Sequence, residues 1–308
     1  METFFDRLDT LYSTGNLTAV EEHILHTVDA LTSAGHSNTL EFASIMNELA
    51  GFYRGTNRFD ESNSAFRKAL DVLEKCDLTQ TPDYVTILLN QAGLQRLMGN
   101  TGEAIDMFLK SKSILENLQQ ESSNAYTNVL NNLSVVYQET DQVDLAIKYA
   151  DTSLSKMREI DSPEHELAAS LNSLSIMHLK KGDFASAEKH VSEALGLYVK
   201  MPVENVDYAA ALATKATICY RKNDYIGALE GFSKSLELTG RFFGKNLEYA
   251  ICERNLAEIY NVIGETASAA IHQESAVEIL VNVLGDDHRS TAEGKNFLKR
   301  LNAEMKGM

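Results

Sequence analysis

Residues that favour tight turns recur along this chain at an almost constant spacing. They are Gly15, Asn57, Gly99, Asp141, Gly182, Asn223 and Gly264, separated by 42, 42, 42, 41, 41 and 41 residues. Each of them lies between two segments with helical patterning. A fixed period in this range is typical of helical repeat arrays, in which each unit packs only on its neighbours. The spacing therefore predicts an all-α, right-handed α-solenoid of antiparallel helix pairs, and it favours recognition over catalysis as the function.

The chemistry of the seven turn residues fits a short connection between two helices. Such a connection commonly needs one residue with a left-handed backbone, which glycine adopts without a steric cost and which asparagine and aspartate tolerate best. We therefore expect all seven residues to have a positive φ angle.

Three further positions in each repeat carry a small residue. Seven residues before the turn lie Ala50, Ala92, Ser134, Ser175, Ala216 and Ala257. Five residues after the turn lie Ser62, Ala104, Ala146, Ala187, Ala228 and Ala269, and seven residues further lie Ala69, Ser111, Ser153, Ala194, Ser235 and Ala276. Small side chains at matched points let two helix backbones approach, where a larger side chain would overpack. These positions predict the helix crossings.

The ends of the chain depart from the repeat. Residues 1–36 are predicted to form a degenerate N-terminal helix pair over Phe4 to Ser33, and residues 37–288 to form six repeats. Residues 289–308 are predicted to form a capping helix, over Ser290 to Asn302, with a short tail. Atypical polar end units are what a solenoid needs, because its last faces meet water. The loops between pairs are expected where Pro82, Pro163 and Pro202 lie.

Composition narrows the class of function. The formal net charge is −16, which disfavours binding to phosphate backbones, so no nucleic-acid partner is expected. The three cysteines are isolated, without a C-x-x-C spacing, and are predicted to be small buried side chains. The N-terminus is acidic where a signal peptide needs positive charge, and no apolar run is long enough to cross a membrane. These features predict a cytoplasmic protein with no membrane partner.

The repeat resembles a known family. The pattern Leu49-Ala50-x-x-Tyr53-x-x-x-Asn57-x-Phe59 is similar to the tetratricopeptide repeat, without its opening tryptophan. Two passages resemble the longer repeats of kinesin light chains, namely Leu130-Asn131-Asn132-Leu133-Ser134-Val135-Val136-Tyr137 and Val283-Leu284-Gly285-Asp286-Asp287-His288. The resemblance covers essentially residues 1–302. Nothing in the chain resembles the heptad coiled coil that joins the kinesin heavy chain, so that activity is not implied.

The resemblance implies a concave face lined by the first helix of each pair. The residues expected to bind a peptide or partner there are Arg54, Asn90, Arg96, Asn131, Asn132, Gln138, Asn172, Lys180, Arg221, Arg254 and Asn255. By analogy with kinesin light chains, an asparagine at one position of this helix would hold the backbone of a bound peptide. An amide suits that role because it both donates and accepts hydrogen bonds. Asn90, Asn132 and Asn255 match this position, whereas Glu48, Ser173 and Thr214 depart from it.

The predicted concave face is less acidic than the whole chain. It carries Arg54, Arg96, Lys180, Arg221 and Arg254 against Glu48, Glu139 and Glu258. A neutral or acidic peptide, or one ending in a free carboxylate, would fit such a face better than a basic one. The alternative is that these asparagine and arginine side chains only keep exposed helix faces soluble.

Other candidate sites are weaker. His23 and His26 lie one helical turn apart but lack a third metal ligand, so a partly exposed helix face explains them better. His178 takes a position between helices that is tyrosine in other repeats, and Asp286-Asp287-His288 takes an ordinary loop position. No nucleotide-binding, nucleophile or metalloprotease motif is present. We expect no enzyme activity, no cofactor and no bound metal.

The sequence thus predicts a non-enzymatic scaffold or adaptor that binds a protein or peptide in its concave groove. Two alternatives remain open. One is a peptide-sensing signalling regulator that resembles the bacterial tetratricopeptide receptors. The other is a structural protein that assembles with itself through its end helices or its acidic convex face, and the oligomeric state stays open with it.

Overall fold

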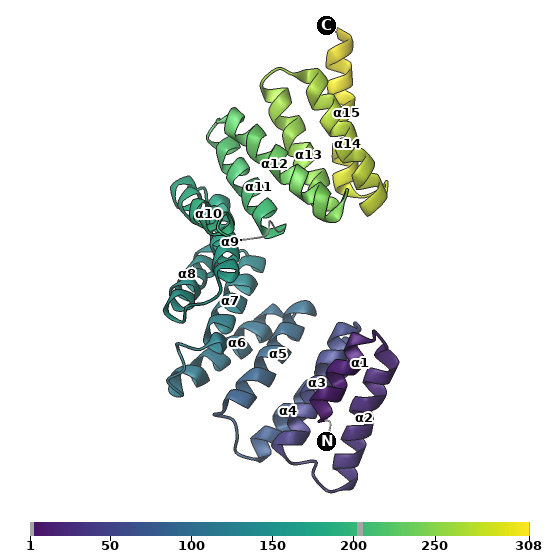
Figure 1. The fold of residues 1–308 in the computed structure, drawn as a ribbon, viewed down its shortest axis with the longest axis vertical. Helices are drawn as coiled ribbons and strands as arrows, with labels where there is room; N and C mark the ends of the chain where they lie inside the picture. The colour runs from purple at the N-terminus through teal and green to yellow at the C-terminus, as the bar shows by residue number, and fades with distance from the viewer. Residues whose placement is uncertain (1–2, 202–205, 308) are drawn as a thin grey trace. The chain divides into compact units, whose positions relative to one another are not determined.

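The computed structural model describes residues 3–201 and 206–307, and the regular elements in these ranges are fifteen helices (Figure 1). The first helices of the seven pairs are α1 (Phe4–Ser13), α3 (Leu40–Gly55), α5 (Pro82–Leu97), α7 (Asn124–Glu139), α9 (Glu164–Lys181), α11 (Val206–Arg221) and α13 (Leu247–Val262). Their partners are α2 (Leu17–Ser33), α4 (Phe59–Lys75), α6 (Thr101–Asn117), α8 (Val143–Glu159), α10 (Phe184–Tyr198), α12 (Tyr225–Phe243) and α14 (Thr266–Leu284), and α15 (Arg289–Gly307) follows. The predicted all-α array of seven pairs and one closing helix is confirmed.

The helices form two compact units, Met1–Asp161 and Ser162–Met308. Unit 1 contains the pairs from α1 to α8, and unit 2 contains α9 to α15. In each unit a helix packs on its own partner and on the next pair along the chain. Pro82 is at the start of α5 and Pro163 caps α9, as expected of residues between pairs. The same prediction for Pro202 lies outside the described residues.

The seven recurring turn residues have the backbone that was predicted for them. Their φ angles lie between 59° for Asp141 and 85° for Gly264, with Asn57 at 60° and Gly182 at 83°. The residue that follows closes the helix end: the Arg58 N–H donates to the Tyr53 carbonyl at 2.8 Å. This six-residue bond satisfies a carbonyl that the helix end would otherwise leave without a partner.

A second series of residues with positive φ, which the sequence did not indicate, follows the second helices. Its members are Gly35, Asp77, Gln119, Asp161, Gly244 and Gly285, with φ angles from 52° to 89°. Gln119, at 56°, is the member least suited to this backbone, because its side chain lacks the short polar group with which asparagine and aspartate support it. Six of the seven pairs therefore have two such residues, one inside the pair and one after it, whereas none follows α10 among the described residues.

Replacing Gln119 by glycine should stabilise unit 1 by about 0.5–1 kcal/mol. Glycine removes the Cβ clash of the left-handed backbone, and this gain exceeds the extra entropy of the unfolded chain. Urea unfolding followed by circular dichroism measures the change. Gln120→Gly is the matched control, because Gln120 is not among the residues with positive φ, and this change should destabilise the unit. A Gln119→Gly protein less stable than the parent would contradict the prediction.

The small residues lie at the helix crossings. All eighteen are at most 3% exposed, so the predicted close packing is confirmed. Two of the serines also donate hydrogen bonds across the crossing: Ser62 Oγ to the Ala50 carbonyl and Ser175 Oγ to the Ala187 carbonyl, both at 2.7 Å. A buried hydroxyl is stable only with such a partner. Serine therefore replaces alanine here without a loss of hydrogen bonding.

A larger side chain fills the core of most pairs four residues after the second small position. We call this the core position; its occupants are Phe66, Phe108, Ala150, Val191, Phe232 and Gln273. The three phenylalanines are at most 2% exposed. Each buried ring removes a large apolar area from water and so holds one pair together.

Polar contacts join successive pairs in a repeated manner. Tyr84 Oη donates to Glu74 at 2.8 Å, and Tyr126 Oη donates to Glu116 at 3.0 Å, one repeat later. Burial raises the pKa of both tyrosines, and the adjacent glutamate raises each further. Both hydroxyls therefore stay protonated and act as donors at neutral pH.

In unit 2, an ion-pair cluster takes the corresponding role between α10 and α11. Glu188 contacts Lys215 and Lys222, each at 2.7 Å. Hydrogen bonds from Lys215 and then Lys222 lower the pKa of Glu188 to about 2. The carboxylate stays charged well below neutral pH, and since its side chain is 36% exposed to solvent the stabilising effect of the ion pairs is small.

Candidate functional site

In unit 1 a cavity of about 550 Å³ lies between α3, α5 and α7. We call it the Asn/Arg groove. It is lined by four of the predicted site residues, Arg54, Asn90, Arg96 and Asn132, together with Thr86, Leu89, Gly93, Leu97, Ala125 and Asn128. The first helices of three successive pairs thus bring two guanidinium groups and three amides to one surface.

The amides of the groove are held in place by hydrogen bonds but keep free capacity. Asn90 Nδ2 donates to Asn47 Oδ1 at 3.0 Å, and Asn132 Nδ2 donates to the Asn128 carbonyl at 2.8 Å. Arg54 Nη1 donates to the Asn90 carbonyl at 3.3 Å. An asparagine amide has two N–H groups and one acceptor oxygen. Asn90 and Asn132 each keep one N–H and the oxygen unbonded within the described ranges, so both still suit a peptide backbone.

Arg96 is the second cation of the groove, and it already has one carboxylate partner. Its Nη1 lies 2.5 Å from Glu139 Oε1 on the next first helix, α7. Its Nε is buried and has no hydrogen-bond partner in the part of the chain that the structure describes. The side chain is 26% exposed. A carboxylate from a ligand could therefore meet an arginine whose orientation is already fixed.

Glu48 lies beside Asn47, and its environment makes it less acidic than usual. Burial raises the pKa of Glu48, and the nearby Asp9 carboxylate raises it further, against a hydrogen bond from Asn47 that lowers it. The glutamate that replaces asparagine at this repeat position therefore repels an acidic ligand less than an exposed glutamate would.

Gly93 is a groove residue that the sequence analysis missed. A Cβ at this position would lie 3.7 Å from Arg54 Nη1, an ordinary van der Waals contact, so this residue lies directly beside the guanidinium. A glycine inside a helix costs stability and often marks a close approach of another group. The interior glycine of α5 was the signal that could have identified this residue.

In unit 2 the predicted residues line two other cavities. Arg221, Arg254 and Asn255 border a space of about 220 Å³ between α11, α12 and α13. Lys180 and Arg221 border one of about 490 Å³ next to α9 and α10. Arg221 thus borders both cavities, together with Arg254 in one and with Lys180 in the other.

Three of the predicted binding residues line none of these cavities. Asn131 and Gln138 line none of these three cavities, although both are partly exposed. Asn172 is only 8% exposed, because the spacing of α9 turns it toward the helix packing. Its amide presents almost no surface to a partner, so we leave Asn172 out of the proposed binding surface.

The weaker candidate sites belong to helix packing. His23 stacks on Phe4 with ring centres 5.0 Å apart, and His178 stacks on His190 at 5.3 Å. His178 Nδ1 also lies 3.2 Å from Asp183 Oδ2. Over residues 3–201 and 206–307, no group of three or more His, Cys, Asp or Glu side chains could hold a metal ion.

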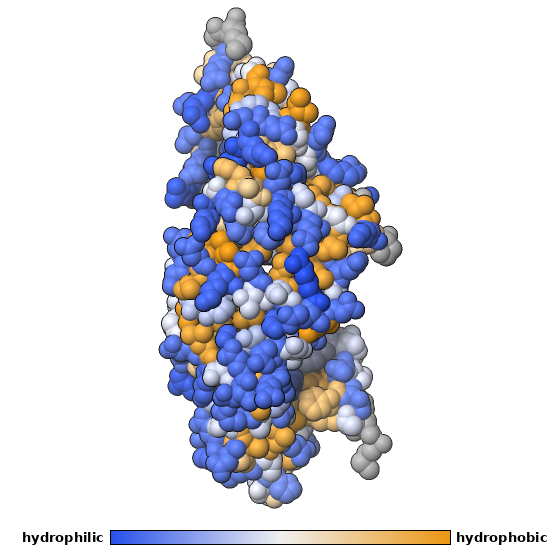
Figure 2. All heavy atoms as spheres, turned by 90° about the vertical axis from the view of Figure 1, so that its left-hand side faces the viewer, coloured by the Kyte–Doolittle hydropathy of each residue, from blue (hydrophilic) through white to orange (hydrophobic). Residues whose placement is uncertain are grey.

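On the face drawn in Figure 2, hydrophobic residues are interspersed among hydrophilic ones rather than gathered into one broad patch. Scattered apolar residues are normal on protein surfaces and need no partner. None of the helices described by the structure is long and apolar enough to cross a membrane.

Comparison with family models identifies the class of protein. Models described as tetratricopeptide repeat match residues 41–117, 126–198 and 254–290, which together are more than half of the chain. The chain belongs to the tetratricopeptide repeat family. No curated protein matches it by sequence.

Solved structures share this fold at low sequence identity. BtubC (BKLC) from P. vanneervenii has a TM-score of 0.63 and 16% identity over 74% of this chain and 93% of its own. A Podosopora anserina protein with nearly identical TPR-like repeats, classed with kinesin light chains, has a TM-score of 0.55 and 14% identity over 66% and 97%. The quorum sensor NprR from B. thuringiensis, in its apo form, has a TM-score of 0.57 and 15% identity over 96% and 85%.

These similarities establish the fold of the chain. The 41–42-residue period of the chain is of the long, kinesin-light-chain-like kind, and the fold is that of a tetratricopeptide α-solenoid. A shared fold at this identity does not carry a partner or an activity with it. The function has to be argued from the groove.

Proposed function

We propose that this protein is a non-enzymatic scaffold that holds an extended peptide, or an extended segment of a partner protein, in the Asn/Arg groove. The observation that supports this most is the convergence of Arg54, Asn90, Arg96 and Asn132 on one cavity of about 550 Å³. These side chains offer amide groups for a peptide backbone and guanidinium groups for a carboxylate.

Binding would depend on a surface that is already arranged. The groove residues lie on packed helices, and the bonds from Arg54 to Asn90 and from Asn90 to Asn47 fix two of the side chains in advance. A fixed surface loses little conformational entropy when a ligand binds, so most of the ordering cost falls on the peptide. An extended peptide would lie across three first helices in this way.

The charge of the groove favours an acidic or neutral segment. A ligand carboxylate would compete with Glu139 for Arg96, at a contact whose partners are 26% and 42% exposed. Surface ion pairs of this kind contribute about 0–1 kcal/mol, so exchanging one carboxylate for another costs little. A basic segment would instead meet two arginines, which repel it.

Selection from a phage-displayed library of random peptides of roughly twelve residues tests the proposal. With the whole chain as bait, we expect the enriched peptides to be neutral or acidic. Their affinity, measured by fluorescence anisotropy, should fall at least about tenfold in the double variant Asn90→Ala, Asn132→Ala, because two backbone contacts are lost. Circular dichroism checks that the variant is folded.

Asn117→Ala is the matched control, since Asn117 is an exposed asparagine at the end of α6, outside the groove. It should leave the affinity unchanged. If the enriched peptides bind the folded double variant as well as the parent protein, the Asn/Arg groove is not the binding surface.

A further inference from the structure

The last helix pair departs from the repeat at its core position. Where the other pairs carry Phe66, Phe108, Ala150, Val191 and Phe232, the seventh carries Gln273. Gln273 is 0% exposed, as buried as the phenylalanines that it replaces. A buried amide costs free energy unless all of its polar atoms have partners, so packing alone does not favour this residue.

The following first helix departs from the repeat at the position that meets Gln273. At this position the first helices α3 to α11 carry a large apolar side chain, namely Met46, Leu88, Leu130, Leu171 and Leu212. The equivalent residue is Glu253 in α13 and Gly294 in α15. A Cβ on Gly294 would lie 3.1 Å from Gln273 Nε2 and 3.1 Å from Val277 Cγ2. Helices α14 and α15 approach closely at this point. The space beside them is not filled by the phenylalanine and leucine that other repeats carry at these two positions.

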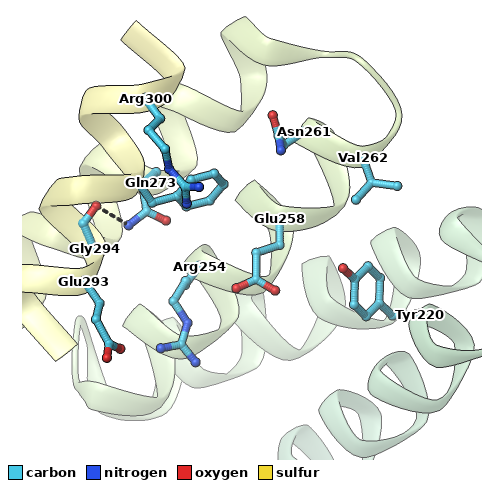
Figure 3. A pocket seen from close by; sticks show the side chains of 10 residues that line it. Tyr220, Arg254, Glu258, Asn261, Val262, Gln273, Glu293, Gly294 and Arg300 are labelled. Carbon is cyan, nitrogen blue, oxygen red and sulfur yellow. Dashed lines mark hydrogen bonds between the residues drawn. The ribbon is translucent and has the colours of Figure 1, made fainter. Parts of the chain in front are cut away.

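A cavity of about 360 Å³ opens beside these two residues (Figure 3). We call it the terminal pocket. Its lining comes from α11, α13, α14 and α15 and consists of Tyr220, Arg254, Glu258, Asn261, Val262, Gln273, Glu293, Gly294, Phe297 and Arg300. It lies wholly within unit 2.

The orientation of the Gln273 amide is fixed, and one of its atoms has no partner. Its Nε2 donates to the Gly294 carbonyl at 3.0 Å, so the nitrogen must face α15. Its Oε1 is buried without a hydrogen bond to any residue that the structure describes. In Figure 3 this oxygen lies on the side away from Gly294, toward the space between Arg300 and Glu258. The wall of the pocket therefore presents an acceptor that lacks a donor.

Opposite charges line the same pocket without neutralising one another. Arg254 and Glu258 form no ion pair or hydrogen bond within residues 3–201 and 206–307, and the buried Arg254 Nε is a second unpartnered atom. Arg300 lies over the Phe297 ring at 5.4 Å. Glu293 is paired with Arg289 at 2.8 Å. The pocket thus holds guanidinium groups and a free carboxylate next to an aromatic ring.

We propose that the terminal pocket binds a small zwitterion of the α-amino-acid class. Its carboxylate would contact the guanidinium groups of Arg254 and Arg300, and its ammonium group would donate to Glu258 and to Gln273 Oε1. A purely acidic ligand would meet Glu258, and a purely basic one would meet the two arginines. Only a ligand with both charges close together satisfies the lining. This inference does not depend on the Asn/Arg groove, which is in unit 1.

Isothermal titration of the whole chain with each of the twenty free α-amino acids tests the inference. At least one of them should bind with a Kd below about 5 mM, and its N-acetylated amide, which carries neither charge, should bind at least about tenfold more weakly. Glu258→Gln and Arg300→Gln, both changes of side chains at the pocket surface, should each weaken binding at least about fivefold.

Gln273→Met separates a binding role from a structural one. Methionine has a similar length and removes the unpartnered oxygen, so the melting temperature should stay the same or rise while binding falls. Arg67→Gln, an exposed arginine of α4 outside both the groove and the terminal pocket, is the control and should leave amino-acid binding unchanged. Absence of binding by all twenty amino acids would overturn the inference, as would equal binding by folded Glu258→Gln and Arg300→Gln. Neither result bears on the peptide selection.

Discussion

Replacing Phe108 by alanine should lower the free energy of unfolding of unit 1 by about 3–5 kcal/mol. Phe108 is 0% exposed and occupies the core position of its helix pair, so alanine leaves a cavity that the surrounding helices cannot fill. Hydrogen exchange measured by mass spectrometry should show loss of protection in α5 to α8. The helices of unit 2 should keep their protection, because the two units have separate cores.

Phe232→Ala is the reciprocal control, since Phe232 is the equivalent residue of unit 2 and is 2% exposed. It should produce the same loss in α11 to α14 and leave unit 1 protected. Equal loss of protection in both units from either change would show that the chain unfolds as a single cooperative body, contrary to this prediction.

The second large effect concerns the charge of the groove. The double variant Arg54→Glu, Arg96→Glu should weaken the binding of an acidic peptide selected on the parent protein by about 100-fold or more, equivalent to about 2.7 kcal/mol. The change removes two carboxylate partners and places two new carboxylates in the groove, the one at position 96 beside Glu139. Isothermal titration at low and high salt measures it, and the difference should shrink as salt screens the charges.

The matched control reverses two exposed cations on α4, with Arg67→Glu and Lys75→Glu. It changes the net charge equally but lies outside the groove, so affinity should change little. A similar loss of affinity in both double variants would mean that net charge, rather than the groove, determines binding.

Much of the fold could be predicted because the same sequence pattern, a turn residue between two helices, occurs seven times. Asn57 and Asp141 indicated left-handed turns by residue type and by spacing together, and the structure has both. Gln119 gave no such signal, since glutamine has no local preference for that backbone, and only the helix packing on either side imposes it. The repeat spacing therefore identifies a left-handed turn where the residue type favours that backbone, but not where only the packing of the helices imposes it.

The site was predictable in part for a related reason. The repeat shows which face of a helix a residue occupies, and Arg54, Asn90, Arg96 and Asn132, which it assigns to one face, line the same cavity. It does not show how deep a residue lies on that face, so Asn172 was included although it is buried. Gln273 could not be predicted from the repeat, because the features that the repeats share say nothing about a position where one of them departs. The pocket beside it arises where one repeat differs from the rest.

The sequence order of the helix contacts has a consequence for synthesis on the ribosome. The main contacts of each described helix are with its neighbours in sequence or the next but one, so no helix has to wait for a distant segment before it can pack. Chains rich in local contacts fold quickly, and domains generally fold from the N-terminus as they emerge. Each pair would find its partner about one repeat after leaving the exit tunnel. A nascent chain halted after Asp161 should therefore already contain a folded unit 1.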